Sequence, residues 1–101
     1  MKKEETKFKE RVIKNLKKRL PDIWWLKTDE QSIRRVPDLL ICYYGCFVAV
    51  ELKVYTEETE MQKVNGRWIE NAGGIYLKID LDNEWVLYDY LDSIERNYSL
   101  T

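Results

Sequence analysis

The alternation of hydrophobic and polar positions along the chain predicts a series of helices and strands. Apolar side chains recur at helical spacing from about Glu4 to Leu20, and Pro21 ends this first helix. A short apolar run from Ile23 to Thr28 predicts a strand. Two further apolar runs flank the dipeptide Tyr44-Gly45, a pattern that is typical of a β-hairpin.

The second half of the chain continues with a helix from about Thr59 to Asn71, which Gly73-Gly74 would end. A strand from Ile75 to Ile79 follows. The segment from Trp85 to Arg96 favours a helix, although its first four residues would also suit a short strand. The apolar positions of the helix before Gly73 form one stripe: Met61, Val64, Trp68 and Ala72.

These elements predict an α/β fold in the order α-β-β-β-α-β-α. The hairpin strands would be antiparallel, and the strand after the second helix would return parallel to them by a crossover. The sequence therefore predicts a central mixed β-sheet that is flanked by helices.

Composition limits the classes of protein that this chain can belong to. It has 101 residues, enough for one domain, and a hydrophobic content of 45% with four Trp indicates a folded globule. The sequence contains no run of about 18 apolar residues, so it predicts no membrane span. Met1 is followed by charged residues rather than an apolar signal segment. We therefore expect a cytoplasmic protein. Two Cys and no His exclude a Cys₂His₂ zinc site and His-based catalysis.

The register of the predicted hairpin brings two acidic residues together. If its loop is only two residues long, Tyr43 pairs with Cys46 and, counting outward, Asp38 pairs with Glu51. Directly opposite residues project on one face about 5 Å apart, so the like charges would repel. A divalent cation reverses this effect, because Mg²⁺ requires converging oxygen ligands. Lys53 would stand beside that position; a longer loop or a bulge would shift the register.

The same residues resemble a known nuclease signature. Pro37-Asp38 at the start of one strand and Glu51-Leu52-Lys53 on the next are similar to the PD-(D/E)XK motif, and the compact chain resembles the virus-type replication-repair nuclease (VRR-Nuc) domains of phages and bacteria. The resemblance extends from Glu5 to about Leu91. It implies a restriction-endonuclease-like core, with residues 1–101 as a single nuclease domain, in the cytoplasm of a bacterial or phage-infected cell.

The resemblance also implies an activity and a set of site residues. The chain would be a nuclease that hydrolyses DNA phosphodiester bonds with Mg²⁺ or Mn²⁺. Asp38, Glu51 and the backbone carbonyl of Leu52 would bind the metal ion. Lys53 would orient or deprotonate the attacking water and stabilise charge on the phosphate.

We place the residues of the first helix around its axis at 100° per residue. Glu5 then falls within the apolar stripe, whereas Glu10 does not. An acid on a buried face needs a partner, but an acid in a frayed first turn would only favour the helix dipole. Glu5 stands three residues before Phe8, as an acid does at the start of VRR-Nuc chains. The resemblance implies that Glu5 binds a second metal ion or a metal-bound water.

Gln62 has two possible roles. It is the fourth residue of Thr59-Glu60-Met61-Gln62 and would complete a capping box at the start of its helix. In the family, a glutamine at this place in the helix after the motif belongs to the active site. The two roles can overlap.

Two arginines precede the first acid of the motif. Arg34 and Arg35 would lie next to Asp38 and could contact a DNA phosphate, although solvated surface charge is the alternative. The net charge of −1 gives no general case for nucleic-acid binding. The family usually has a glycine just before Pro-Asp, and here Arg35-Val36 stands instead, which leaves the conformation of this loop open.

Four Trp and seven Tyr exceed what so small a core can bury, which points to an aromatic surface. We expect a homodimer with exposed rings such as Trp24 or Trp85 at its interface, because family members of this size resemble Holliday-junction resolvases. The alternatives are rings packed inside a monomer or a surface for DNA stacking.

The expected substrate is branched or flapped DNA, cut by a structure-sensitive endonuclease. A competing hypothesis is a non-catalytic DNA-binding or partner-binding module that retains the nuclease fold. A third is a nuclease subunit of a larger phage or restriction complex.

Overall fold

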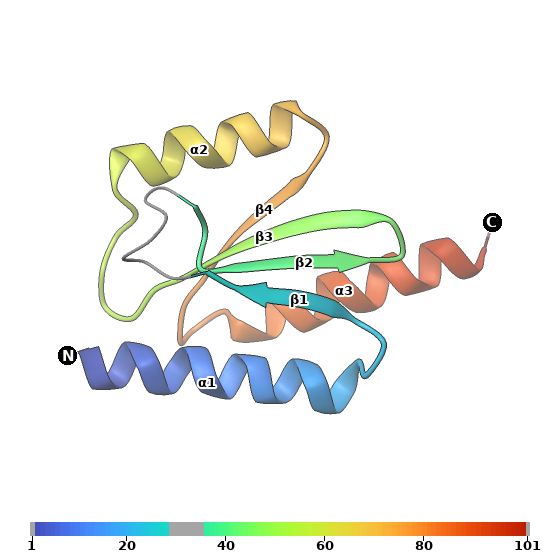
Figure 1. The fold of residues 1–101 in the computed structure, drawn as a ribbon, viewed down its shortest axis with the longest axis horizontal. Helices are drawn as coiled ribbons and strands as arrows, with labels where there is room; N and C mark the ends of the chain where they lie inside the picture. The colour runs from blue at the N-terminus through green and yellow to red at the C-terminus, as the bar shows by residue number, and fades with distance from the viewer. Residues whose placement is uncertain (1, 29–35, 101) are drawn as a thin grey trace.

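The computed structural model describes residues 2–28 and 36–100 and has the predicted order of elements (Figure 1). The last element is a helix and not a short strand. The chain is thus a small α/β protein. Its elements are α1 (Lys2–Arg19), β1 (Trp24–Lys27), β2 (Leu39–Tyr43), β3 (Cys46–Leu52), α2 (Glu60–Asn71), β4 (Ile75–Ile79) and α3 (Glu84–Ser99).

The four strands form one mixed sheet in the order β1-β2-β3-β4. β1 and β3 are both antiparallel to β2, and β4 is parallel to β3. Because α2 connects β3 to β4, both strands can run in the same direction. The prediction of an antiparallel hairpin followed by a parallel fourth strand is confirmed.

The hairpin has the two-residue loop that sets the predicted register. Tyr43 pairs with Cys46, and the φ angles of Tyr44 and Gly45 are 49° and 79°. Positive φ at both loop residues is the geometry of a type I′ turn, whose twist matches that of the flanking strands. The register therefore needs no bulge.

One face of the sheet carries the core and is covered by α1 and α3, which lie below the sheet in Figure 1. Alternate residues of β2 and β3, beginning with Leu39 and Val48, point toward these helices and are fully buried. The helices contribute an apolar stripe each: Phe8, Val12 and Leu16 from α1, and Leu87, Leu91 and Ile94 from α3. Within the described residues, no helix is long and apolar enough to cross a membrane.

Polar contacts fix α1 against α3. The Glu84 carboxylate accepts hydrogen bonds from Arg11 at 2.6 Å, from Asn15 at 3.3 Å and from the Tyr88 hydroxyl at 2.5 Å. The Arg19 guanidinium also lies 4.6 Å from the centre of the Tyr88 ring. These contacts set the position of α1, which carries side chains of the candidate site.

α2 packs on the opposite face of the sheet, over β4, through a residue that sequence analysis did not select. Gly66 is buried, and a Cβ atom there would lie only 2.6 Å from Cδ2 of Tyr76. Glycine at this position lets the helix approach the Tyr76 ring. The predicted apolar stripe does not face the sheet: Met61 and Trp68 are exposed.

Candidate functional site

Two buried carboxylates lie side by side where β2 begins and β3 ends. Leu39 pairs with Val50, so the next step of the register places Asp38 opposite Glu51. Asp38 is 6% exposed and Glu51 is 3% exposed. The structure thus confirms the juxtaposition that the hairpin register predicted.

Both oxygens of the Asp38 carboxylate have partners. The Lys9 ammonium group lies 3.1 Å from Oδ1, and the backbone N–H of Leu52 donates to Oδ2 at 2.9 Å. Lys9 projects from α1 and is only 8% exposed. The Asp38 charge is therefore held by one buried cation and one backbone amide.

The second carboxylic acid of the pair, Glu51, has a strongly raised pKa. Burial, followed by a hydrogen bond to Asp38 and the repulsion of its charge, raises the pKa of Glu51 to about 9. The positive charges of Lys53 and Lys9 act in the opposite direction but are weaker. At neutral pH Glu51 therefore keeps its proton, while the Lys9 ammonium group lies against Asp38.

Gln62 completes the predicted capping box and also contacts the carboxylate pair. Its backbone N–H donates to Thr59 Oγ1 at 3.1 Å, and its side-chain Oε1 accepts from the Thr59 backbone N–H at 2.8 Å, which completes the capping box. Its Nε2 donates to Glu51 Oε1 at 3.2 Å. The start of α2 is thereby joined directly to the carboxylate pair.

No contact with the carboxylate pair is described for the predicted site residues Glu5, Arg34 and Arg35. Glu5 is half-buried and Glu10 is exposed, so the phase assigned to α1 is correct. In the described part of the chain, no three acidic, Cys or His side chains gather closely enough to hold a metal ion, and the role of Glu5 stays a prediction. Arg34 and Arg35 lie outside the described residues.

Leu52 and Lys53 flank the pair at the end of β3. The Leu52 side chain lies in the core while its N–H contacts Asp38; the role of its carbonyl as a metal ligand stays a prediction. The Lys53 N–H donates to the Ile79 carbonyl at 2.9 Å, so the backbone remains paired beyond the strand. The Lys53 side chain is half-buried, and its charge acts on Glu51.

Sequence analysis missed two lysines of this site. Lys9 falls at 40° when Glu5 is taken as zero, in the middle of the apolar stripe of α1, so the helical phase alone could have found it. Lys78 pairs with Glu51 across β3 and β4 and lies on the same sheet face. Only the parallel register, which depends on the tertiary fold, shows that neighbourhood.

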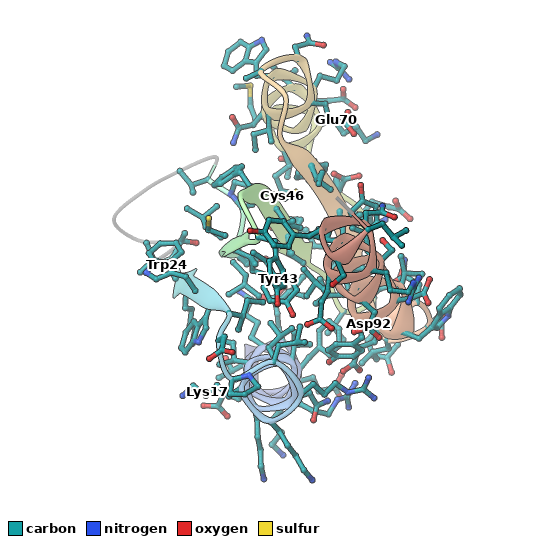
Figure 2. The ribbon with its side chains drawn as sticks, turned by 90° about the vertical axis from the view of Figure 1, so that its right-hand side faces the viewer. Lys17, Trp24, Tyr43, Cys46, Glu70 and Asp92 are labelled. Carbon is teal, nitrogen blue, oxygen red and sulfur yellow. The ribbon has the colours of Figure 1, made fainter. Side chains whose placement is uncertain are left out.

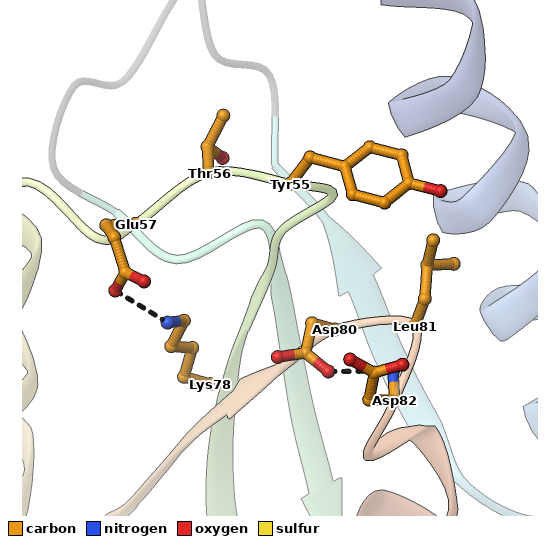
Figure 3. Close-up of a pocket in the computed structure, with 7 residues that line it drawn as sticks. All are labelled: Tyr55, Thr56, Glu57, Lys78, Asp80, Leu81 and Asp82. Atoms are coloured by element: carbon orange, nitrogen blue, oxygen red, sulfur yellow. Dashed lines mark hydrogen bonds and ion pairs between the residues drawn. The ribbon is translucent and has the colours of Figure 1, made fainter.

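Lys78 also lines an open hollow of about 370 Å³ (Figure 3). Its Nζ lies 3.2 Å from the carboxylate of the exposed residue Glu57. On the far side of the hollow, Asp80 accepts a hydrogen bond from the backbone N–H of Asp82 at 2.8 Å. The lining combines four charged residues with three neutral ones: Tyr55, Thr56, Glu57, Lys78, Asp80, Leu81 and Asp82.

The donor atoms of the pair fit a magnesium or manganese ion. Mg²⁺ is commonly bound by one or two carboxylates and keeps several of its waters. Asp38 and Glu51 supply two adjacent carboxylates, and a divalent ion between them would favour the ionised form of Glu51, whose pKa burial raises. A divalent ion would have to share Asp38 with Lys9 or displace it.

The comparisons with known proteins add no relative. Neither a scan against models of protein families nor a search of curated proteins found a match for this chain.

Proposed function

We propose that this protein is a Mg²⁺- or Mn²⁺-dependent nuclease with a restriction-endonuclease-like core. One observation carries the proposal: Asp38 and Glu51 are buried side by side, and Lys53 follows two residues later. Two adjacent buried carboxylates are unfavourable in a purely structural sheet. The resemblance of Pro37-Asp38 and Glu51-Leu52-Lys53 to the PD-(D/E)XK motif points to the same chemistry.

Each residue of the site has a separate task in this proposal. Asp38 and Glu51 hold the ion, which when bound polarises the phosphate and lowers the pKa of a nearby water. Gln62 fixes the orientation of the Glu51 carboxylate through its Nε2 hydrogen bond. Lys53 orients the attacking water and stabilises charge on the phosphate, since its positive charge acts on Glu51.

The proposed substrate is DNA with a branch or a flap, as the family resemblance implies. Lys78 could assist its binding, since this cation lies beside Glu51 on the same sheet face. Its ion pair with Glu57 is exposed and would exchange readily for a phosphate contact. Arg34 and Arg35 remain proposed phosphate contacts, on the sequence argument alone.

The test is cleavage of supercoiled plasmid, flapped duplex and four-way-junction DNA with Mg²⁺ or Mn²⁺, and with a chelator as the control. We expect cleavage that requires the metal and is abolished in Lys53→Ala. Lys63→Ala is the matched control, because Lys63 is an exposed lysine on α2 and should leave the rate unchanged. Cleavage by Lys53→Ala within tenfold of the wild-type rate would remove Lys53 from the mechanism.

A second candidate function is binding of DNA without cleavage. The observation that favours it is the Lys9–Asp38 ion pair, which already neutralises one proposed metal ligand. This function predicts a shift of branched DNA in a gel with no product at any metal concentration. The same DNA substrates therefore distinguish the two functions.

A further inference from the structure

The described helices cover only part of the sheet face that carries the carboxylate pair. A sheet of four strands spaced about 4.8 Å apart is wide enough for two helices side by side, since packed helices lie about 8–10 Å apart. The core face carries two helices, α1 and α3. Of the described helices, only α2 covers the other face, where it packs over β4 and leaves β1 and β2 without a helix (Figure 2).

The uncovered part of this face is apolar. Trp24, Cys42 and Phe47 form one row across the strands, and Leu26 and Leu40 form the next row. Trp24 is 56% exposed, and in Figure 2 it lies at the sheet edge farthest from α2. We call these residues the open face: Trp24, Leu26, Leu40, Cys42 and Phe47.

The helix beside the open face also has an exposed apolar side. Met61, Val64 and Trp68 follow one another at helical spacing on α2, and we call them the α2 stripe. Trp68 is 60% exposed. The stripe is not used for packing on the sheet, because α2 approaches the sheet through Gly66 instead. One chain therefore presents both a position for a helix and a helix with an unburied apolar side.

We propose that the occupant of the open face is α2 of a second copy of this chain, so that two copies form a symmetric dimer. In a two-fold dimer each contact occurs twice, which requires complementary surfaces on the same molecule. The open face and the α2 stripe meet this condition. The α2 helix of each copy covers β1 and β2 of the other and supplies the missing helix of that layer.

The size of the apolar surface agrees with a stable dimer. The exposed parts of the open face and the α2 stripe amount to on the order of 500 Å², since a whole aromatic side chain offers about 150–250 Å². A standard interface buries about 800 Å² on each partner, of which about 60% is apolar. Apolar surface of several hundred Å² often marks a site of protein–protein interaction.

A nucleic-acid strand fits the same surface less well. Binding of single strands needs cations along the path as well as aromatic rings. The described residues of the open face and the α2 stripe carry no charged side chain, and Leu26, Leu40 and Met61 are aliphatic. The chemistry of the surface therefore favours a protein partner with the same apolar character.

The test is sedimentation velocity of the whole chain at micromolar concentration, without metal or DNA, so that its result is independent of any nuclease activity. We expect the wild type at twice the chain mass of 12.2 kDa. Trp68→Glu and Trp24→Glu should each give a monomer, because either one places a charge in the interface. Trp85→Glu is the matched control: Trp85 is 65% exposed but lies on α3, across the sheet, so this variant should remain a dimer.

A mixing experiment tests the reciprocal contact directly. Trp68→Glu and Trp24→Lys should be monomers alone and form a mixed dimer together, since one contact then joins opposite charges and the other is unchanged. Any one of three results would overturn the proposed arrangement. These are a monomeric wild type, a dimer that is lost in Trp85→Glu but kept in the other two variants, and no association on mixing.

Discussion

At the residue scale, the protonated Glu51 makes stability depend on pH. Because its folded pKa is raised to about 9, the folded protein keeps a proton that the unfolded chain loses near pH 4.5. The stabilisation is fully present below pH 4.5 and is lost progressively as pH rises toward 9. Without metal, the free energy of unfolding should therefore decrease across this window.

Glu51→Gln tests this dependence, because glutamine resembles the protonated acid and cannot ionise. We expect the variant to gain stability over the wild type as pH is raised from 5 to 9, with a difference of several degrees in melting temperature at the upper end. Thermal melts monitored by circular dichroism in the presence of a chelator give the measurement. Glu10→Gln, at an exposed position of α1, should follow the wild type at every pH.

Lys9 is the second residue whose removal should be costly. Removing one partner of a buried ion pair typically destabilises a protein by about 3–5 kcal/mol, because the other charge remains buried. Lys9→Met should therefore lower the melting temperature without metal by at least roughly 10 °C. Mg²⁺ should restore part of the loss if it binds Asp38, since the ion replaces the missing positive charge.

Lys7→Met is the control for that experiment, because Lys7 is exposed on the same helix. Equal melting temperatures for the two methionine variants would show that the Lys9–Asp38 pair adds nothing to stability. The experiment also measures how strongly Lys9 competes with a metal ion for Asp38.

At the scale of elements, the start of α2 combines a helix cap with the candidate site. Thr59→Ala removes only the cap acceptor and should lower stability by about 1 kcal/mol, while cleavage at a temperature below melting is unchanged. Gln62→Glu keeps an acceptor for the Thr59 N–H but replaces the donor to Glu51 with a third carboxylate. This second variant should lose cleavage while α2 remains capped.

Melting curves and initial cleavage rates, measured on both variants, separate the two roles of Gln62. An equal loss of cleavage in both variants would mean that Gln62 acts only by holding the helix. Asn71, near the other end of α2, provides an exposed control position for a neutral substitution.

Sequence analysis found the elements because each has a local pattern. The turn at Tyr44-Gly45 set the register of the hairpin, and that register placed Asp38 opposite Glu51 before any tertiary information was used. The packing of α2 was not predictable in this way. Its most apolar side is exposed, because close approach of the glycine to Tyr76 determines which side faces the sheet. Lys78 was missed for a related reason, since its proximity to Glu51 depends on the β3–β4 pairing.

At the scale of the whole molecule, metal binding should be coupled to folding. An ion that binds only the folded chain stabilises it by mass action, by about 2.7 kcal/mol at 100 times its dissociation constant. Millimolar Mg²⁺ or Mn²⁺ should therefore raise the melting temperature of the wild type, whereas Asp38→Asn should show little shift. Asp22→Asn, at an exposed position before β1, should respond as the wild type does. A shift in Asp38→Asn equal to that of the wild type would argue against a shared site.

The placement of the tryptophans has a consequence for spectroscopy. Trp24, Trp68 and Trp85 are already mostly in water, and only Trp25 is partly buried against the core. Unfolding of a single copy would therefore change the indole emission very little, and fluorescence would underestimate the transition that circular dichroism records. Association of two copies through the open face would transfer Trp24 and Trp68 from water to an apolar environment. Emission from this protein would then shift to shorter wavelength with concentration, and so would report assembly better than folding.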